Sequence, residues 1–212
     1  MWDIVQAAGW PIWFLILASV IAVALILERS RALRAALITP ATALPAARLM
    51  IENDDASPAP LTQLALQGSL GAVLAAGIRA AQAPNASLPA MQAAMDDALH
   101  FESHALNRYL PALGTVAGVA PLLGLFGTVI GMIETFGAQT PSGMNPAQLA
   151  HGISVALYNT AMGIFVAIVA LIAYRWLRSK AESFVLAIDR ASGTLLATAE
   201  AKNTAANAAK VP

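Results

Sequence analysis

The chain contains no cysteine and few charged residues. Of its 212 residues, 11% are charged and 58% are apolar, whereas soluble domains carry about 25% charged residues. The absence of cysteine excludes a disulfide framework and a thiolate metal site. Walker, HExxH, GxSxG and dinucleotide-binding motifs are also missing, so we expect neither an enzyme nor a bound cofactor. We likewise expect no nucleic-acid partner.

Three apolar stretches, at residues 10–27, 113–136 and 152–174, are long enough to cross a lipid bilayer. A membrane-spanning helix needs about 20 mainly apolar residues. The first stretch has no basic residue before it and no small-residue cleavage pattern after it, and Arg29 and Arg31 follow it. We therefore expect a retained span rather than a cleaved signal peptide.

The basic residues are confined to two parts of the chain. All twelve Lys and Arg residues lie within residues 29–108 and 175–210. Because positive charge marks the cytoplasmic side of a membrane protein, both parts are predicted to lie inside the cell. The predicted order is a periplasmic N-terminus (1–9), span 1 (10–27), a cytoplasmic helical region (28–112), span 2 (113–136), a periplasmic loop (137–151), span 3 (152–174), and a cytoplasmic C-terminal helix and tail (175–212).

The predicted cytoplasmic region favours helix, because it is rich in Ala, Leu and Gln and poor in β-branched residues. We expect helices at residues 41–52 and 61–82, and a third, capped by Ser87, that runs on into span 2. Span 3 should also continue past Tyr174, while residues 200–212 should be frayed or disordered. The predicted fold is an all-α integral membrane protein with three transmembrane helices. The second and third extend into the cytoplasm and pack with additional cytoplasmic helices.

Residues 121–131, PLLGLFGTVIG, combine glycines, a proline and a threonine without any charge. A simple membrane anchor does not need this mixture. Glycines three or four residues apart let neighbouring helix backbones approach closely, and Pro121 removes one helical hydrogen bond. We expect this helix to pack against other helices, including those of neighbouring subunits. The predicted packing residues are Gly114, Gly118, Gly124, Gly127, Gly131, Gly163 and Pro121.

The three spans lack ionisable side chains between residues 10–27, 113–133 and 152–174. A proton relay through a carboxylate needs a titratable group at membrane depth, so this chain cannot provide one alone. It offers hydroxyls and an amide, which can line a hydrated path or bind a carboxylate of another protein. Ser and Thr hydroxyls can equally bond back to a carbonyl of their own helix. The candidate pathway residues are Thr128, Thr160, Asn159 and Ser154.

Two histidines, His100 and His104, have a spacing that can bind a metal ion. No third ligand is evident near them, since Glu102 falls on a different helix face, and a metal site needs three or four converging ligands. We therefore predict no metal site. His151 lies at the outer mouth of span 3, where a boundary role is expected.

Two segments, APLLGLFGTVIGMIETF (120–136) and GISVALYNTAMG (152–163), closely resemble the MotA/TolQ/ExbB proton-channel family. The similarity is nearest to the ExbB and TolQ branch. It implies a multi-pass protein of a Gram-negative inner membrane that forms a homo-oligomeric ring, a pentamer, in the lipid bilayer. It also implies an ExbD- or TolR-like single-span partner that supplies an intramembrane aspartate, and a TonB- or TolA-like protein that spans the periplasm. By position, Thr128 and Thr160 match the pore-facing threonines of the family.

The chain departs from the family pattern at three positions. Many relatives have glutamate where this chain has Val155, proline where it has Val169, and asparagine where it has Arg175. Because valine cannot carry a proton, an essential proton-relay role of this position is not expected in this chain. Loss of the proline predicts a straighter third span.

The predicted function is that of a proton-channel subunit that uses the proton motive force for outer-membrane transport or envelope maintenance. A flagellar-type stator subunit is one alternative, although such subunits usually have four spans and a larger charged cytoplasmic domain. A passive membrane scaffold is another. A solute transporter is a third, weakened by the lack of a charged or aromatic cluster at midplane.

Overall fold

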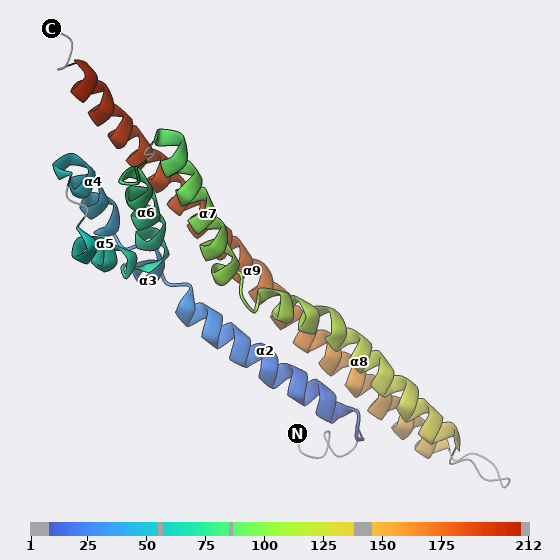
Figure 1. Ribbon diagram of the computed structural model, residues 1–212. Coiled ribbons are helices and arrows are strands. Elements are labelled where there is room, and N and C mark those ends of the chain that lie inside the picture. Colours follow the sequence, from blue (N-terminus) through green and yellow to red (C-terminus); the bar gives the residue numbers. More distant parts are fainter. Residues whose placement is uncertain (1–8, 55–56, 85–86, 138–145, 209–212) are drawn as a thin grey trace. The chain divides into compact units, whose positions relative to one another are not determined.

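The computed structural model describes residues 9–54, 57–84, 87–137 and 146–208, and all regular structure in these ranges is α-helical (Figure 1). Most of the predicted N-terminal segment 1–9 and of the predicted loop 137–151 lies outside the described residues, as do the last four residues of the predicted tail. The helices are α2 (Ile12–Ala32), α3 (Ala35–Ile38), α4 (Ala43–Asn53), α5 (Pro58–Ala65), α6 (Gly68–Ala81), α7 (Leu88–Leu106), α8 (Leu110–Gly137) and α9 (Pro146–Ala208).

The chain divides into two compact units. The first unit comprises Met1–Arg29 and Tyr109–Leu177, and therefore holds most of α2, all of α8 and the first part of α9. The second unit comprises Ser30–Arg108 and Arg178–Pro212, and holds α3 to α7 with the second part of α9.

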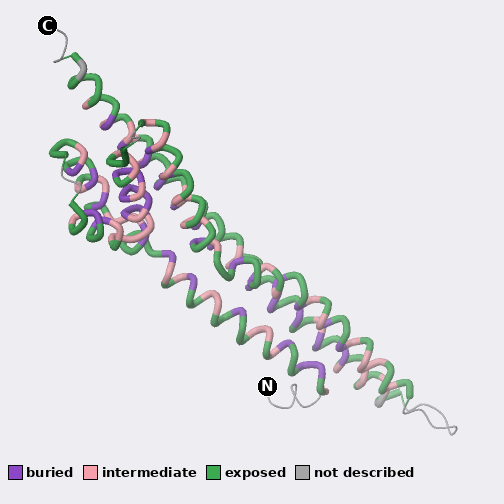
Figure 2. Tube along the Cα trace, viewed as in Figure 1, coloured by how far each residue is buried: buried purple, intermediate pink, exposed green. Residues whose placement is uncertain are grey.

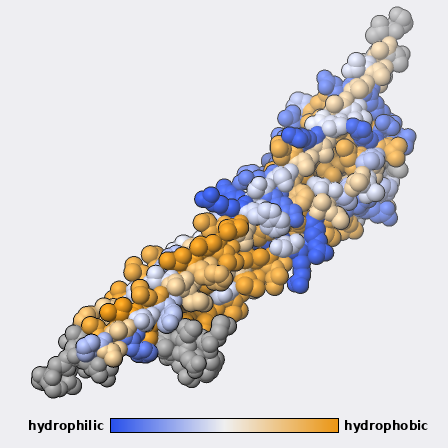
Figure 3. Space-filling model, turned by 180° about the vertical axis from the view of Figure 1, so that it is seen from behind, coloured by the Kyte–Doolittle hydropathy of each residue, from blue (hydrophilic) through white to orange (hydrophobic). Residues whose placement is uncertain are grey.

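Three helices in the described ranges are long and apolar enough to cross a membrane, which confirms the predicted number of spans. Only 22%, 22% and 33% of the residues in their apolar windows are buried within the chain. Many of their large apolar side chains are exposed. The tube in Figure 2 is coloured mostly exposed or intermediate along these helices, and the space-filling view in Figure 3 displays extensive hydrophobic surface. Water would not tolerate so much contiguous apolar surface on a monomer, whereas lipid would solvate it.

Within the first unit, α2 runs antiparallel to α8. The ring of Trp10 meets the ring of Phe126 edge-on at 6.1 Å, while the guanidinium carbon of Arg29 lies 5.4 Å from the ring centroid of Tyr109. Arg29 is buried, and its side chain also pairs with the carboxylate of Glu28 through two contacts of 2.5 and 2.7 Å. A charge at the end of a span is thereby neutralised and stacked on an aromatic ring.

The second unit is built around α6, whose apolar face packs along α7 and also contacts α3, α4 and α5. Gly77 makes this close packing possible, because a Cβ there would come within 2.6 Å of the sulfur of Met95. Met91 and Met95 of α7 and Leu74 of α6 are almost fully buried in the resulting core. The start of α7 agrees with the prediction, since the N–H of Ala90 donates to the Ser87 hydroxyl at 3.2 Å.

The helix predicted at residues 61–82 is divided into α5 and α6, so this prediction was wrong. The chain turns at residues 66–68, where Gly68 has a φ of +74° and its backbone packs on α3. A Cβ at Gly68 would clash with the carbonyl oxygen of Leu37. Glycine is therefore required both for the backbone conformation and for the close approach.

The single helix predicted from Ser87 into span 2 was also wrong, because α7 and α8 are separate helices. Residues 107–109 form the break, and Tyr109 takes a left-handed φ of +65°. Non-glycine residues rarely adopt this conformation, and the stacked Arg29 side chain contacts Tyr109 from α2. Pro111 then falls in the first turn of α8, where its missing N–H leaves no hydrogen bond unmade. Further along, α8 continues through Pro121 without a break.

The predicted disorder of residues 200–212 is contradicted as far as Ala208, where α9 ends. The prediction was based on the low apolar content of this segment. It could not include the long-range polar contact of Lys202, which has no signature in the sequence. Lys202 Nζ donates to the carbonyl oxygen of Ile51 at 2.6 Å and pairs with the Asp54 carboxylate at 2.5 Å. Both acceptors lie at the C-terminus of α4, whose partial negative charge favours a cation.

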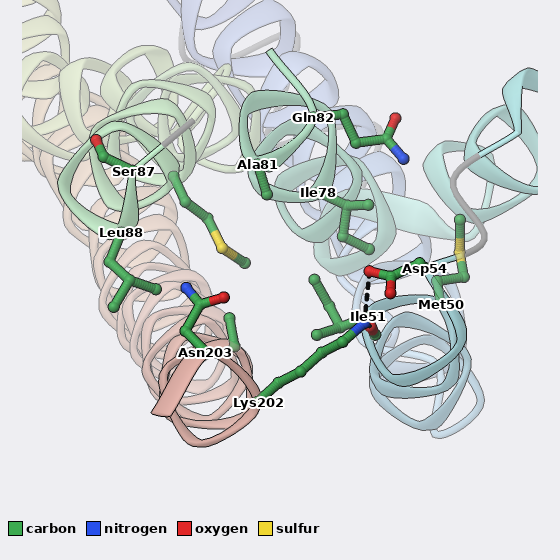
Figure 4. A pocket seen from close by; sticks show the side chains of 12 residues that line it. Met50, Ile51, Asp54, Ile78, Ala81, Gln82, Ser87, Leu88, Lys202 and Asn203 are labelled. Atoms are coloured by element: carbon green, nitrogen blue, oxygen red, sulfur yellow. Dashed lines mark hydrogen bonds and ion pairs between the residues drawn. The ribbon is translucent and has the colours of Figure 1, made fainter. Parts of the chain in front are cut away.

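A cavity of about 230 Å³ adjoins this contact within the second unit. Figure 4 shows the Lys202 side chain reaching along it to Asp54, with Asn203 and Leu88 on the same wall and Ile78 and Met50 opposite. The contact therefore closes one side of a space between α4, α6, α7 and α9.

We predict that Lys202→Ala loosens the last turns of α9. The Lys202 side chain is 31% exposed and that of Asp54 is 86% exposed, so the free energy of unfolding should fall by less than about 1 kcal/mol. Amide hydrogen exchange in residues 198–208 should nevertheless accelerate, because the contact holds a helix end with little apolar surface. Lys202→Arg is the matched control and should keep the protection. Equal exchange rates in Lys202→Ala and the unaltered protein would contradict this role.

Candidate functional site

The centre of the first unit is a seam in which the backbones of α8 and α9 touch. A Cβ at Gly124 would lie 2.8 Å from the carbonyl oxygen of Asn159 and 3.1 Å from the Cα of Thr160. A Cβ at Gly163 would lie 2.9 Å from the Cα of Gly124 and 2.6 Å from the carbonyl oxygen of Ala120. Neither neighbour is a flexible side chain, so only glycine fits at these two positions.

The seam continues along both helices in antiparallel order. Gly127 faces the side chain of Asn159, and a Cβ at Gly127 would lie 2.8 Å from the Asn159 Cγ. A Cβ at Gly131 would lie 3.4 Å from the Cβ of Ala156. Gly114, near the other end of α8, lies against the ring of Tyr174 at 3.4 Å. We expected the glycines to serve contacts between subunits, but these positions contact α9 of the same chain.

One of the predicted packing residues, Gly118, takes no part in the seam. A Cβ at Gly118 would meet no atom within 4 Å, so this position has open space around it. Pro121 is only partly buried and sits one turn before Gly124. Gly118 is therefore available for contact with another molecule, while Gly124, Gly127 and Gly163 are already covered.

Asn159 is the buried polar residue of the seam. It is 1% exposed, and the absence of a side chain at Gly127 makes room for its amide. The Oδ1 atom accepts no hydrogen bond from the described residues, while the residue has other polar interactions. Burying an amide in an apolar setting is costly unless it is hydrogen-bonded, so its placement between two helices constrains how they pack.

Thr128 lies one turn beyond Gly124 and is partly buried. Its hydroxyl donates to the carbonyl oxygen of Leu125 at 2.6 Å, which is the local bonding pattern weighed from the sequence. Thr128 also contributes the hydroxyl to an otherwise apolar open groove of about 620 Å³ along α8. The other residues of this groove are Val129, Met132, Ile133, Phe136 and Gly137.

Thr160 and Ser154 sit differently on α9. Thr160 is partly buried with its Cα against Gly124, whereas Ser154 is exposed and donates to the carbonyl oxygen of Ala150 at 2.9 Å. The backbone of Thr160 therefore packs against Gly124, one turn before Thr128 on α8. Ser154 lies outside the glycine contacts.

Sequence reasoning missed a second close contact, between the C-terminal part of α8 and the N-terminal part of α9. A Cβ at Gly152 would come within 2.6 Å of the Thr135 methyl carbon, and the Thr135 hydroxyl donates to the carbonyl oxygen of Gly131 at 2.7 Å. Gly152 and Gly163 are eleven residues apart on α9, a spacing of three helical turns that keeps both on one face. That spacing is the only sequence feature that could have indicated the contact.

The chemistry of this region is that of neutral hydrogen-bonding groups in an apolar helix pair. No acidic or basic residue lies between residues 113 and 133 or between 152 and 174. Within the described ranges, no three His, Asp, Glu or Cys side chains converge as metal ligands would. The fold and the seam define a three-span helical membrane protein whose membrane interior carries hydroxyls and an amide but no charge.

Residues 65–190 match the model of the MotA/TolQ/ExbB proton channel family. This match covers more than half of the chain, and the chain belongs to this family. It includes α6, α7, α8 and α9 as far as Arg190, so the resemblance found in the two span motifs is confirmed.

Curated relatives carry the names of the ExbB and TolQ branch. The Tol-Pal system protein TolQ of Pseudomonas aeruginosa is 39% identical over 103 residues, which are 48% of this chain and 45% of that protein. TolQ of Haemophilus influenzae is 42% identical over 43% of this chain and 41% of its own length. Biopolymer transport protein exbB1 of Vibrio cholerae is 41% identical over 34% of this chain and 33% of its own length. The chain thus spans less than half the length of these relatives.

We predict that Gly163→Ala separates α8 from α9. The added methyl group would meet backbone atoms of Ala120 and Gly124, so the free energy of unfolding should fall by about 1–3 kcal/mol. Gly118→Ala is the matched control, because its methyl group would enter open space and alanine favours helix. Thermal unfolding of both variants in the same detergent measures the difference. A Gly163→Ala variant as stable as Gly118→Ala would contradict the seam.

Proposed function

We propose that the chain is a proton-channel subunit of an inner-membrane complex of the ExbB–ExbD or TolQ–TolR type. The complex would use the proton motive force to energise a TonB- or TolA-like protein for outer-membrane transport or envelope maintenance. The observation that carries the proposal is the α8–α9 seam, which belongs to the family-matched segment and holds hydroxyls and an amide at membrane depth without any acid.

The topology follows from the charge distribution. All twelve basic residues lie before residue 109 or after residue 174, so the second unit and the end of α9 are assigned to the cytoplasm. Residues 1–9 and 137–151 are then periplasmic, and the spans are 10–27, 113–136 and 152–174. With this orientation Thr128 and Thr160 lie within the bilayer, and the groove beside Thr128 runs along the periplasmic half of α8.

A second chain must supply the titratable group. In this proposal it is an ExbD- or TolR-like single-span protein whose aspartate enters a ring, a pentamer, of the present chain. Thr128, Thr160, Asn159 and Ser154 are the assigned pathway residues. Val155, one turn before Asn159, is partly buried and cannot take a proton, which makes the partner's carboxylate the sole acid at this depth.

The role of the hydroxyls is to hold the partner's carboxylate between its charged and neutral forms. A hydroxyl that donates to a carboxylate stabilises the charged form. Thr160, and Thr128 once its hydroxyl turns away from the Leu125 carbonyl that it bonds in the isolated chain, would make a local ionised state accessible in lipid. Proton entry from the periplasm neutralises the carboxylate, and release to the cytoplasm restores its charge. Each proton that crosses yields about 2.3 kcal/mol per 100 mV of membrane potential, which is enough to bias one step of the partner relative to the ring.

Thr160→Val removes the hydroxyl and keeps the shape of the side chain. Proton-dependent activity of the assembled complex should fall by roughly tenfold to a hundredfold, because a hydrogen bond to a charged group contributes about 1.5–3 kcal/mol. Thr160→Ser should restore activity. The measurement is proton flux into proteoliposomes that contain the chain and its single-span partner.

Thr115→Val is the matched control. Thr115 lies thirteen residues before Thr128 on α8, which is about 20 Å along the helix, and its hydroxyl donates to the carbonyl oxygen of Pro111 at 3.0 Å. At that distance from the assigned pathway residues, its loss should leave the flux unchanged. Co-purification of the partner shows that each variant still assembles. Full proton flux through assembled Thr160→Val complexes would argue for a passive scaffold or for a path elsewhere.

A further inference from the structure

Two arginines near the C-terminus of α2, Arg31 within the helix and Arg34 just after it, differ from their neighbour Arg29 in their interactions. Arg29 is buried, pairs with Glu28 and stacks on Tyr109. Arg31 and Arg34 are exposed, and neither forms an ion pair with any part of the chain that the structure describes. The chain therefore presents two uncompensated positive charges directly after its first span.

The position of these charges along the chain matches the headgroup layer. Helix α2 continues to Ala32, so Arg31 stands about 6 Å beyond Leu27, the last apolar residue of the span. The polar layer on each side of the hydrocarbon core is roughly 5–8 Å thick. Arg34 follows two residues after the helix ends. Both guanidinium groups can therefore reach lipid phosphates without any rearrangement of the helix.

Two exposed leucines lie on either side of a backbone contact within the second unit. The first of them follows the arginines by a few residues in the sequence. Leu37 of α3 is 60% exposed, and Leu66, between α5 and α6, is 81% exposed. The backbone of Gly68 packs on the carbonyl of Leu37, which brings the turn that contains Leu66 to α3. A hydrogen bond of 3.1 Å from the Thr42 hydroxyl to the Gln67 side chain joins the same turn to the start of α4.

We propose that Arg31, Arg34, Leu37 and Leu66 form a docking surface, the Arg–Leu surface, for anionic phospholipids of the leaflet in which α2 ends. The arginines bind the lipid phosphates through paired N–H donors. The leucines enter the boundary between headgroups and acyl chains, as apolar residues of interfacial segments do. This inference rests on α2 crossing the bilayer and is independent of the proton path.

The combination of groups favours a lipid surface over a soluble anion or a protein. A free phosphate would use the guanidinium groups but would leave two leucines exposed to water. A membrane interface satisfies both kinds of group at once, and juxtamembrane basic residues are attracted to anionic lipid by about 1 kcal/mol each.

The test uses a fluorescent reporter placed beside the surface. The chain has no cysteine, so Ala36→Cys, at an exposed position between Arg34 and Leu37, accepts a polarity-sensitive fluorophore at a single site. The full-length labelled protein in detergent is titrated with phosphatidylglycerol in mixed micelles, and with phosphatidylcholine in parallel. We expect a saturable change of emission with phosphatidylglycerol and a much weaker one with phosphatidylcholine.

Replacing both arginines tests their role. Arg31→Gln with Arg34→Gln should raise the Kd for phosphatidylglycerol by about 30-fold, at about 1 kcal/mol per arginine and 1.4 kcal/mol per tenfold. Arg31→Lys with Arg34→Lys keeps the charge and should retain most of the affinity, which separates lost binding from lost folding. Arg48→Gln with Arg79→Gln changes the net charge equally at two exposed positions elsewhere in the second unit and should leave the Kd unaltered.

Four results would overturn the proposal. The first is an equal response to phosphatidylcholine, and the second is an equal loss in the Arg48 and Arg79 double variant. The third is a response to inorganic phosphate without lipid, which would indicate a soluble-anion site. The fourth is a response that follows protein concentration in lipid-free detergent, which would assign the surface to a second copy of the chain.

Discussion

The close approach of α8 and α9 is the constraint on which the membrane part of this protein depends. Gly124 and Gly163 bring two backbones into contact where any side chain would clash, and that contact sets the register of the two helices. The register then determines where Asn159 is buried and which turn of α8 lies beside Thr160. In lipid no hydrophobic effect drives helices together, so packing of small residues and polar contacts must do so.

Under the proposed function, the same seam supplies only part of the proton path, and the ring and the second chain belong to that proposal. Its membrane interior has hydroxyls and an amide but no acid, and an uncharged helix pair is far easier to keep in lipid than one with a carboxylate. A titratable group on a separate helix could move relative to the ring, whereas one fixed in the seam could not. In the proposed complex, dividing the hydroxyls and the acid between two chains would suit a device that converts proton movement into motion.

Sequence reasoning was most successful where one physical cause acted alone. Long apolar runs predicted three spans, and Ser87 predicted a helix start, because hydrophobic length and capping are local properties. It failed at Gly68, Tyr109 and Lys202, each of which depends on a partner distant in sequence: Leu37, Arg29 and the end of α4. Glycine periodicity indicated a packed helix. Whether each glycine faces α9 or another molecule could be determined only from the structure of the two paired helices.

The most direct test of the central claim is proton flux measured with and without the second chain. Proteoliposomes that contain this chain alone should show no flux above that of empty liposomes under an imposed membrane potential. Addition of the single-span partner with its intramembrane aspartate should produce flux, and substitution of that aspartate by asparagine should abolish it. Flux through the chain alone, equal to that of the assembled complex, would contradict the claim that the acid belongs to another protein.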